Sequence, residues 1–120
     1  MWILMNRAFF SIVQSRNNKN QFLVRARAER DIETIFPQAD VLENAGTDYK
    51  YRTFLDKSIV LKAITQEMES IDYDNFKNSV PFHDFKRHEV YYDVWVALTQ
   101  LQEREKETRE NNTYVKEYNI

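Results

Sequence analysis

The 120-residue sequence contains no cysteine, one glycine and two prolines. The lack of cysteine excludes disulfide bonds, thiolate zinc sites and thiol nucleophiles, and it leaves two histidines and the carboxylates as metal ligands. It also favours a cytoplasmic location. A single glycine provides no glycine-rich loop for holding phosphate groups and no long flexible linker. We therefore expect no bound cofactor.

Long hydrophobic runs are also lacking. The apolar segment 1–5 ends at Asn6 and Arg7, far short of the roughly 20 residues that cross a bilayer. It has no basic region of the kind that opens a signal peptide. The 17 basic and 19 acidic side chains nearly cancel, so the formal net charge is −2. We expect no membrane association, and nucleic acid could bind only at a local basic patch.

Aromatic and other apolar residues are plentiful. They make up 42% of the chain and include eight Phe, seven Tyr and two Trp, which is enough for one hydrophobic core. Short runs rich in aromatic and β-branched residues indicate strands. We predict strands at 2–5, 9–14, 22–27 and 49–55, a weaker strand at 40–43, and a short helix at 29–36 that ends before Pro37.

The period of the apolar residues changes after Asp56. Val60, Ile64 and Met68 recur at helical spacing and predict a helix over about 58–71. A second helix is expected over about 84–105, with an apolar stripe that begins at Val90. The predicted fold class is α+β, with an antiparallel four- to five-stranded sheet followed by two α-helices packed on one face.

The C-terminal part of the chain differs in composition. Residues 103–112 read EREKETRENN, which can form a solvated helix supported by weak i,i+4 pairs. Terminal segments are frequently mobile, so we expect a mobile tail from Tyr114 to Ile120. The predicted organisation is a single domain at 1–102 and a charged helical extension with a mobile tail at 103–120.

Four cationic side chains alternate along two predicted strands. They are Arg25, Arg27, Lys50 and Arg52. Side chains two residues apart share a sheet face, so these four could form one surface for phosphate or carboxylate groups. In the alternative interpretation the face is simply solvated, and Glu43 on the intervening strand pairs with the cations. Tyr49 and Tyr51 are expected on the opposite face, which does not favour base stacking.

A second group has the residue types of a metal or acid–base site. Its members are Asp72, Asp74, His83 and His88. The two histidines are five residues apart, roughly 140° around a helix, so a shared site requires the helix to begin after His83. Alternatively, Asp84 caps the helix and His88 is a hydrogen-bonded surface residue beside Tyr91 or Tyr92. Known catalytic motifs are lacking, so an enzyme is the less favoured hypothesis.

An aromatic group surrounds the turn into the last helix. It consists of Tyr73, Phe76, Phe82, Phe85, Tyr91, Tyr92 and Trp95. We expect most of these side chains to be core, but they cannot all bury on one helix face. The remainder would form an exposed patch, with Tyr91 and Trp95 as candidate binding residues. A homodimer through the last helix is one alternative.

Several segments together resemble a group of short uncharacterised bacterial proteins, of a kind that phages and other mobile elements could also carry. They are FFSIV at 9–13, LVRAR at 23–27, DIETIFP at 31–37, DYKYR at 48–52, IDYDNFK at 71–77 and the run from Arg87 to Trp95. The resemblance covers residues 1–102 and implies one intact domain. Because that group has no assigned activity, it implies no catalytic or binding role.

These observations favour a non-enzymatic binding or regulatory protein that acts through the basic sheet face or the aromatic edge near the last helix. Its partner would be a protein or a nucleic acid. One alternative is a small metal-dependent hydrolase or nuclease. Another is a phage-encoded inhibitor of a host defence complex with an acidic tail that mimics nucleic acid, although Arg104, Lys106 and Arg109 give that tail mixed charge.

Overall fold

The structure is a computed structural model that describes residues 1–44 and 46–118, with side chains through residue 112. The chain divides into two compact units, Met1–Ser79 and Val80–Ile120, and each is described by itself. The first contains a five-stranded antiparallel sheet and three helices, and the second contains one long helix, which confirms the α+β class. Within the described residues, no helix is both long and apolar enough to cross a membrane. The expected division into 1–102 and 103–120 stays a prediction.

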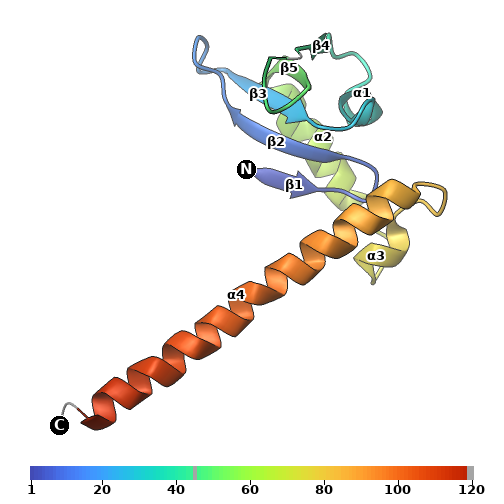
Figure 1. Ribbon diagram of the computed structural model, residues 1–120. Coiled ribbons are helices and arrows are strands. Elements are labelled where there is room, and N and C mark those ends of the chain that lie inside the picture. The colour runs from blue at the N-terminus through green and yellow to red at the C-terminus, as the bar shows by residue number, and fades with distance from the viewer. Residues whose placement is uncertain (45, 119–120) are drawn as a thin grey trace. The chain divides into compact units, whose positions relative to one another are not determined.

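The sheet of the first unit has the strand order β1-β2-β3-β5-β4, with every neighbouring pair antiparallel (Figure 1). Its strands are β1 (Trp2–Leu4), β2 (Phe9–Gln14), β3 (Gln21–Ala26), β4 (Leu42–Glu43) and β5 (Tyr51–Asp56). β3 and β5 pair along six residues, whereas β4 pairs along only two. Glu43 was expected on a strand between the two basic strands, but β4 is an edge strand beyond β5.

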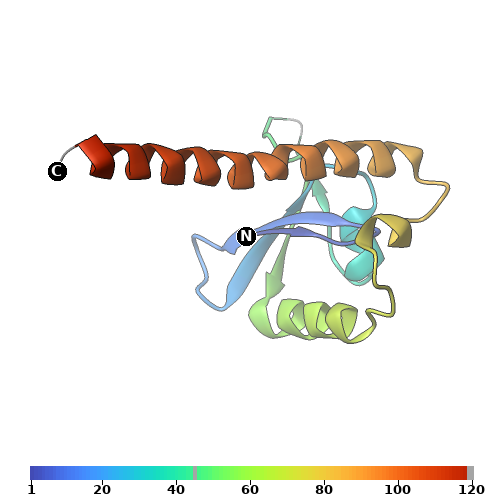
Figure 2. The same ribbon diagram turned by 90° about the horizontal axis from the view of Figure 1, so that it is seen from below.

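One face of the sheet forms the hydrophobic core. Alternate strand residues on this face, including Phe10, Ile12 and Val24, are buried against α1 (Asp31–Ile35) and α2 (Lys57–Glu69). α1 contributes Ile32 and α2 contributes Val60 to the same cluster. Figures 1 and 2 show both helices on this side of the sheet. The period-two pattern of the strands and the helical period of α2 thus meet in one core, as predicted.

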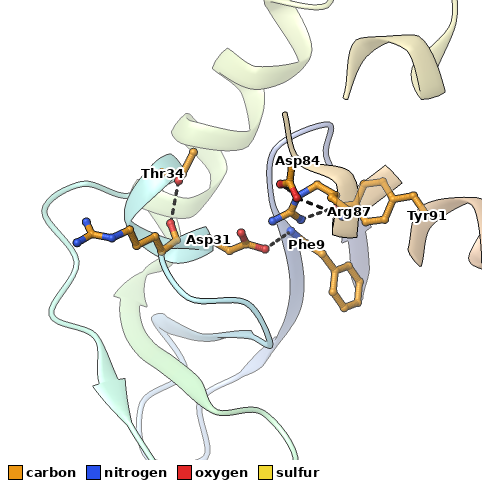
Figure 3. A network of polar contacts seen from close by, with 7 residues as sticks. Phe9, Asp31, Thr34, Asp84, Arg87 and Tyr91 are labelled. Atoms are coloured by element: carbon orange, nitrogen blue, oxygen red, sulfur yellow. Dashed lines mark hydrogen bonds and ion pairs between the residues drawn. The ribbon is translucent and has the colours of Figure 1, made fainter. Parts of the chain in front are cut away.

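Side chains and backbone groups define the ends of the shorter helices. The buried Asp31 carboxylate at the start of α1 accepts a hydrogen bond of 3.0 Å from the Phe9 backbone N–H, which joins α1 to β2 (Figure 3). No helix was predicted between the helices expected over 58–71 and 84–105, but α3 (Phe76–Ser79) forms one helical turn there. The Asn75 side chain accepts a hydrogen bond of 3.1 Å from the Asn78 N–H, which caps this turn.

The second unit is built on α4 (Phe85–Tyr118), which is longer than the predicted helix. Asp84 caps it, as predicted, because its Oδ1 accepts a hydrogen bond of 3.1 Å from the Arg87 N–H. The charged stretch contains no glycine or proline and includes an i,i+4 ion pair between Glu105 and Arg109, so the helix continues. The side chains of residues 113–120 lie outside the described residues, and the mobility of that tail stays a prediction.

Candidate functional site

The sheet face opposite α1 and α2 carries a row of residues that crosses all five strands in register. The row, here called the arginine row, consists of Trp2, Ser11, Arg25, Arg52 and Leu42. Cross-strand partners share a face of the sheet, so these five side chains lie on one surface. Its centre is cationic, and its two ends are the exposed apolar side chains of Trp2 and Leu42.

Tyr49 connects a third arginine to the row. The guanidinium carbon of Arg25 lies 4.7 Å from the centre of the Tyr49 ring, and that of Arg27 lies 4.2 Å from it. Arg25 Nη2 donates a hydrogen bond of 2.8 Å to Ser11 Oγ, and Arg27 Nη1 donates one of 2.7 Å to the Asp48 carbonyl. Ser11, Tyr49 and the Asp48 carbonyl therefore hold the guanidinium groups of Arg25 and Arg27 in fixed positions.

The expected position of Tyr49 was wrong. The predicted strand at 49–55 implies that Tyr49 lies on the face opposite Lys50 and Arg52, but β5 begins only at Tyr51. Strand alternation therefore does not set the direction of the Tyr49 side chain, which is buried against Arg25 and Arg27. Tyr51 does pack with the core, on the face opposite Arg52.

The charges of the row are not balanced by carboxylates. In the described part of the chain, no acidic side chain forms an ion pair with Arg25, Arg27 or Arg52. Arg25 and Arg52 lie directly opposite each other on paired strands, which is unfavourable for like charges. The Nε atoms of both are buried without a hydrogen-bond partner. A buried donor without a partner costs about 1–3 kcal/mol, so this arrangement opposes folding.

Lys50, the fourth predicted cation, is not part of the row. It precedes β5, and its Nζ lies 3.3 Å from Glu43 Oε1 on the edge strand β4. The hydrogen bond from Lys50 to Glu43 raises the pKa of the lysine. The alternative interpretation, in which Glu43 neutralises the predicted basic face, is therefore correct for Lys50, while Arg25, Arg27 and Arg52 have no such partner in the part of the chain that the structure describes.

The aromatic group near the last helix is more exposed than expected. Phe82 is 85% exposed, and Phe85, Tyr92 and Trp95 are each at least half exposed, whereas Tyr91 is buried. The prediction that most of the group is core was wrong, because the described residues of the second unit, 80–118, form little more than one helix and have no second layer of their own. Of the two predicted binding residues here, Trp95 is exposed and Tyr91 is not.

Tyr91 belongs instead to a polar network at the start of α4. Arg87 Nε lies 2.9 Å from Asp84 Oδ2, and Arg87 Nη1 donates a hydrogen bond of 3.1 Å to the Tyr91 hydroxyl (Figure 3). Burial alone would raise the pKa of Asp84, but the hydrogen bonds and positive charge of Arg87 hold it below its ordinary value. Asp84 is therefore a charged cap, and the network stabilises the first turns of α4.

The predicted metal ligands do not form a recognisable site. Within the residues that the structure describes, no group of three or more histidine, aspartate or glutamate side chains could hold a metal ion. Asp72, Asp74 and His83 are exposed, and α4 begins after His83. His88 was expected to be a hydrogen-bonded surface residue, but its Nε2 is buried without a partner. The nearby Asp84 carboxylate is already bonded to Arg87.

The arrangement is suited to binding an anionic group rather than to acid–base chemistry, because guanidinium groups stay protonated and donate hydrogen bonds in a planar fork. Sequence reasoning identified Arg25, Arg27 and Arg52 but missed Ser11 and Tyr49, and it did not include the apolar ends of the row.

Comparisons of the chain with protein family models, with curated proteins and with solved structures found no match, so its function is inferred from this geometry.

Proposed function

We propose that this chain is a non-enzymatic binding protein that engages an acidic protein surface through the arginine row. The observation that carries the proposal is the pair of register-matched arginines, Arg25 and Arg52, with buried Nε donors and with no carboxylate partner among the described residues. Such an arrangement opposes folding, and residues that lower stability are characteristic of binding sites. A carboxylate of a partner would supply the missing negative charge and would form charge-assisted hydrogen bonds.

The apolar ends of the row support a protein partner rather than a nucleic acid. Trp2 is 70% exposed and Leu42 is 53% exposed. Exposed tryptophan and arginine beside apolar side chains are typical of protein interfaces. Nucleic-acid binding relies on many phosphate contacts and, for single strands, on free aromatic rings. The row and the adjacent Arg27 offer three arginines, and the ring of Tyr49 is buried beneath Arg25 and Arg27.

The proposal is tested by charge reversal at the two central arginines. An R25E/R52E variant and wild type are used as baits in lysate of the source cells, and retained proteins and nucleic acids are identified by mass spectrometry and sequencing. We expect a protein with an acidic surface to be retained by wild type, and its affinity for the variant to fall at least about tenfold. Its binding to wild type should also weaken as salt concentration rises.

Arg16 provides the matched control, because it is exposed in the β2–β3 connection and R16E changes the charge of an arginine away from the row. R16E should retain the same protein with affinity within about twofold of wild type. Equal retention by R25E/R52E would overturn the proposal. Retention of nucleic acid in place of protein, lost in R25E/R52E but not in R16E, would show that the row binds phosphate groups of a nucleic acid.

The exposed aromatic residues of the second unit favour a second contact surface for the same binding protein. Phe82 and Phe85 form an edge-to-face pair with ring centres 5.9 Å apart, and Tyr92 and Trp95 form a tilted pair 6.1 Å apart. Exposed patches of this kind mark interaction sites or contacts between copies. Sedimentation of wild type and of F85A/W95A tests the homodimer: a dimer that the double substitution dissociates is expected, and a monomeric wild type would exclude it.

A further inference from the structure

The sheet has an edge strand whose outward backbone groups are unpaired. β1 pairs only with β2, and Met1 and Met5 use their backbone groups in bonds to Ile12 and Ala8. Hydrogen-bonded residues alternate along an antiparallel strand, so the N–H and C=O groups of Trp2 and Leu4 point away from β2. In the described part of the chain these groups form no hydrogen bond.

A cavity of about 450 Å³ lies beside this edge, within the first unit. Ile3, Leu4 and Met5 line it on the strand side, and Ile64, Met68 and Ile71 line it on the side of α2. This volume is within the usual range of ligand pockets, about 300–1,000 Å³. The cavity could therefore accept one or two apolar side chains from a segment that runs along the β1 edge.

The cavity rim carries an ion pair and one further carboxylate. Arg7 and Glu67 form an ion pair with each other across the rim. Asp72 also lines the cavity, and its carboxylate has no hydrogen-bond or ion-pair partner in the described part of the chain. Met1 lines the cavity as well, and its N-terminal ammonium group donates a hydrogen bond to the Ile12 carbonyl, so the rim as a whole has no net charge. The Asp72 carboxylate is nevertheless available to a basic side chain of the occupant.

The opposite edge of the sheet shows how an edge is normally protected. β4 is only two residues long, and it carries the exposed Glu43–Lys50 ion pair. Short length and charged side chains discourage the addition of another strand. β1 is less protected than β4, because residues 1–5 include no charged side chain. An open apolar edge beside a cavity is the arrangement used when a peptide adds a strand to a sheet.

We propose that β1 binds an extended segment of a partner protein as a sixth strand, with an apolar side chain in the cavity and a basic side chain at Asp72. An extended chain repeats its outward backbone groups about every 7 Å, which matches the spacing from Trp2 to Leu4. A small apolar molecule could fill the cavity but would leave those four groups unpaired. The inference concerns a surface separate from the arginine row and does not depend on it.

The test uses a display library of random eight-residue linear peptides. We expect the enriched peptides to share an apolar residue with a neighbouring lysine or arginine. Hydrogen exchange followed by NMR on an enriched peptide then reports the binding mode directly. The Trp2 and Leu4 amides should exchange at least about tenfold more slowly with the peptide bound, whereas the Ile3 amide, which faces β2, should be protected in both states.

Three variants locate the peptide. L4P removes an outward N–H on an edge strand, where proline is tolerated, and M68K places a charge in the apolar wall; each should weaken binding at least about tenfold. L61K is the matched control, because Leu61 lies on the same helix, is 59% exposed against 66% for Met68, and does not line the cavity. It should leave the affinity within about twofold of wild type.

Two results would overturn the proposal. One is a library that yields no enriched peptide, and the other is an enriched peptide that binds L4P and M68K as tightly as wild type. The R25E/R52E variant separates this site from the arginine row. If it retains the peptide, the two sites are distinct. If it loses the peptide while L4P keeps it, the peptide binds the arginine row, and the inference about β1 fails while the proposed function stands.

Discussion

Alternate residues of the same strands give the two faces of the sheet opposite chemistry. On the core face, Phe10 and Val24 are fully buried against α1 and α2. On the other face, the neighbouring residues Ser11 and Arg25 belong to a row whose two central arginines have no carboxylate partner within the described residues. The core face therefore holds the fold together, while the arginine row lowers its stability. This difference supports the proposal that the arginine row is the binding surface, and four predictions test the difference.

The largest effect is expected on the core face. Phe10 is fully buried and its ring lies 5.8 Å from that of Phe36, so F10A should lower the free energy of unfolding by about 3–5 kcal/mol. Phe54 is the control, because it lies on the other face and is 45% exposed, and F54A should cost less than about 1 kcal/mol. Urea unfolding measures both. Equal losses would mean that the two faces contribute equally to stability.

The second prediction concerns the buried carboxylate of Asp31, which has a hydrogen-bond partner, unlike the Nε atoms of Arg25 and Arg52. The Asp31 carboxylate accepts a hydrogen bond from the Phe9 N–H, so D31A should lower the free energy of unfolding by about 1–3 kcal/mol. D31N keeps an acceptor oxygen and should lose less. Urea unfolding of both variants provides the measurement, and an undiminished stability of D31A would show that this contact does not hold α1 to β2.

The third prediction contrasts a paired arginine with the unpaired ones. Asp84 caps α4 and pairs with Arg87, so D84A should cost about 1 kcal/mol, and D84N, which can still accept the capping bond, should cost less. Because the pKa of Asp84 is lowered in the folded state, its contribution is present above the ordinary carboxyl pKa and is lost as pH falls below about 4.

The exchange rate of the Arg87 amide, measured by NMR across this range, reports the loss of the cap. It should rise at low pH relative to amides in the middle of α4, after correction for intrinsic exchange. D84N has no carboxyl group to titrate and is the control, since its Arg87 amide should show no such rise. An identical pH response in the two proteins would exclude Asp84 as the titrating group.

The strands and helices could be predicted because their signals are local. Alternation in β2, β3 and β5 and the helical spacing from Val60 to Met68 each depend on residues close in sequence. α3 was missed because a four-residue helix has no periodic signal. α4 was predicted too short because apolar spacing ends near Leu101, although the charged residues beyond it favour a helix.

The site could be predicted only in part, because the arginine row depends on which strands are neighbours. Alternation alone grouped Lys50 with Arg52, but residues 49 and 50 precede β5 and their side chains follow the local turn. The direct pairing of Arg25 with Arg52, and the position of Ser11 beside them, follow from the strand order β2-β3-β5. Strand order is set by long-range packing, which no short sequence pattern contains.

The smallest effect, and the one of opposite sign, is expected at Arg52. R52M removes a buried donor without a partner and a charge directly opposite Arg25, while it keeps a long apolar side chain. We expect the free energy of unfolding to rise by about 1 kcal/mol, because no attractive contact is lost. K50M is the control, since Lys50 is exposed and paired with Glu43, and it should change stability by less than about 0.5 kcal/mol.

The result for R52M matters only together with binding. A variant that is more stable and no longer retains the acidic partner shows that Arg52 is kept for binding at the expense of stability. A variant that is less stable by more than about 1 kcal/mol would show that the arginine supports the sheet, for example by packing its stem against neighbouring side chains. In that case the difference between the two faces would be one of composition alone, and the arginine row would no longer mark the binding surface.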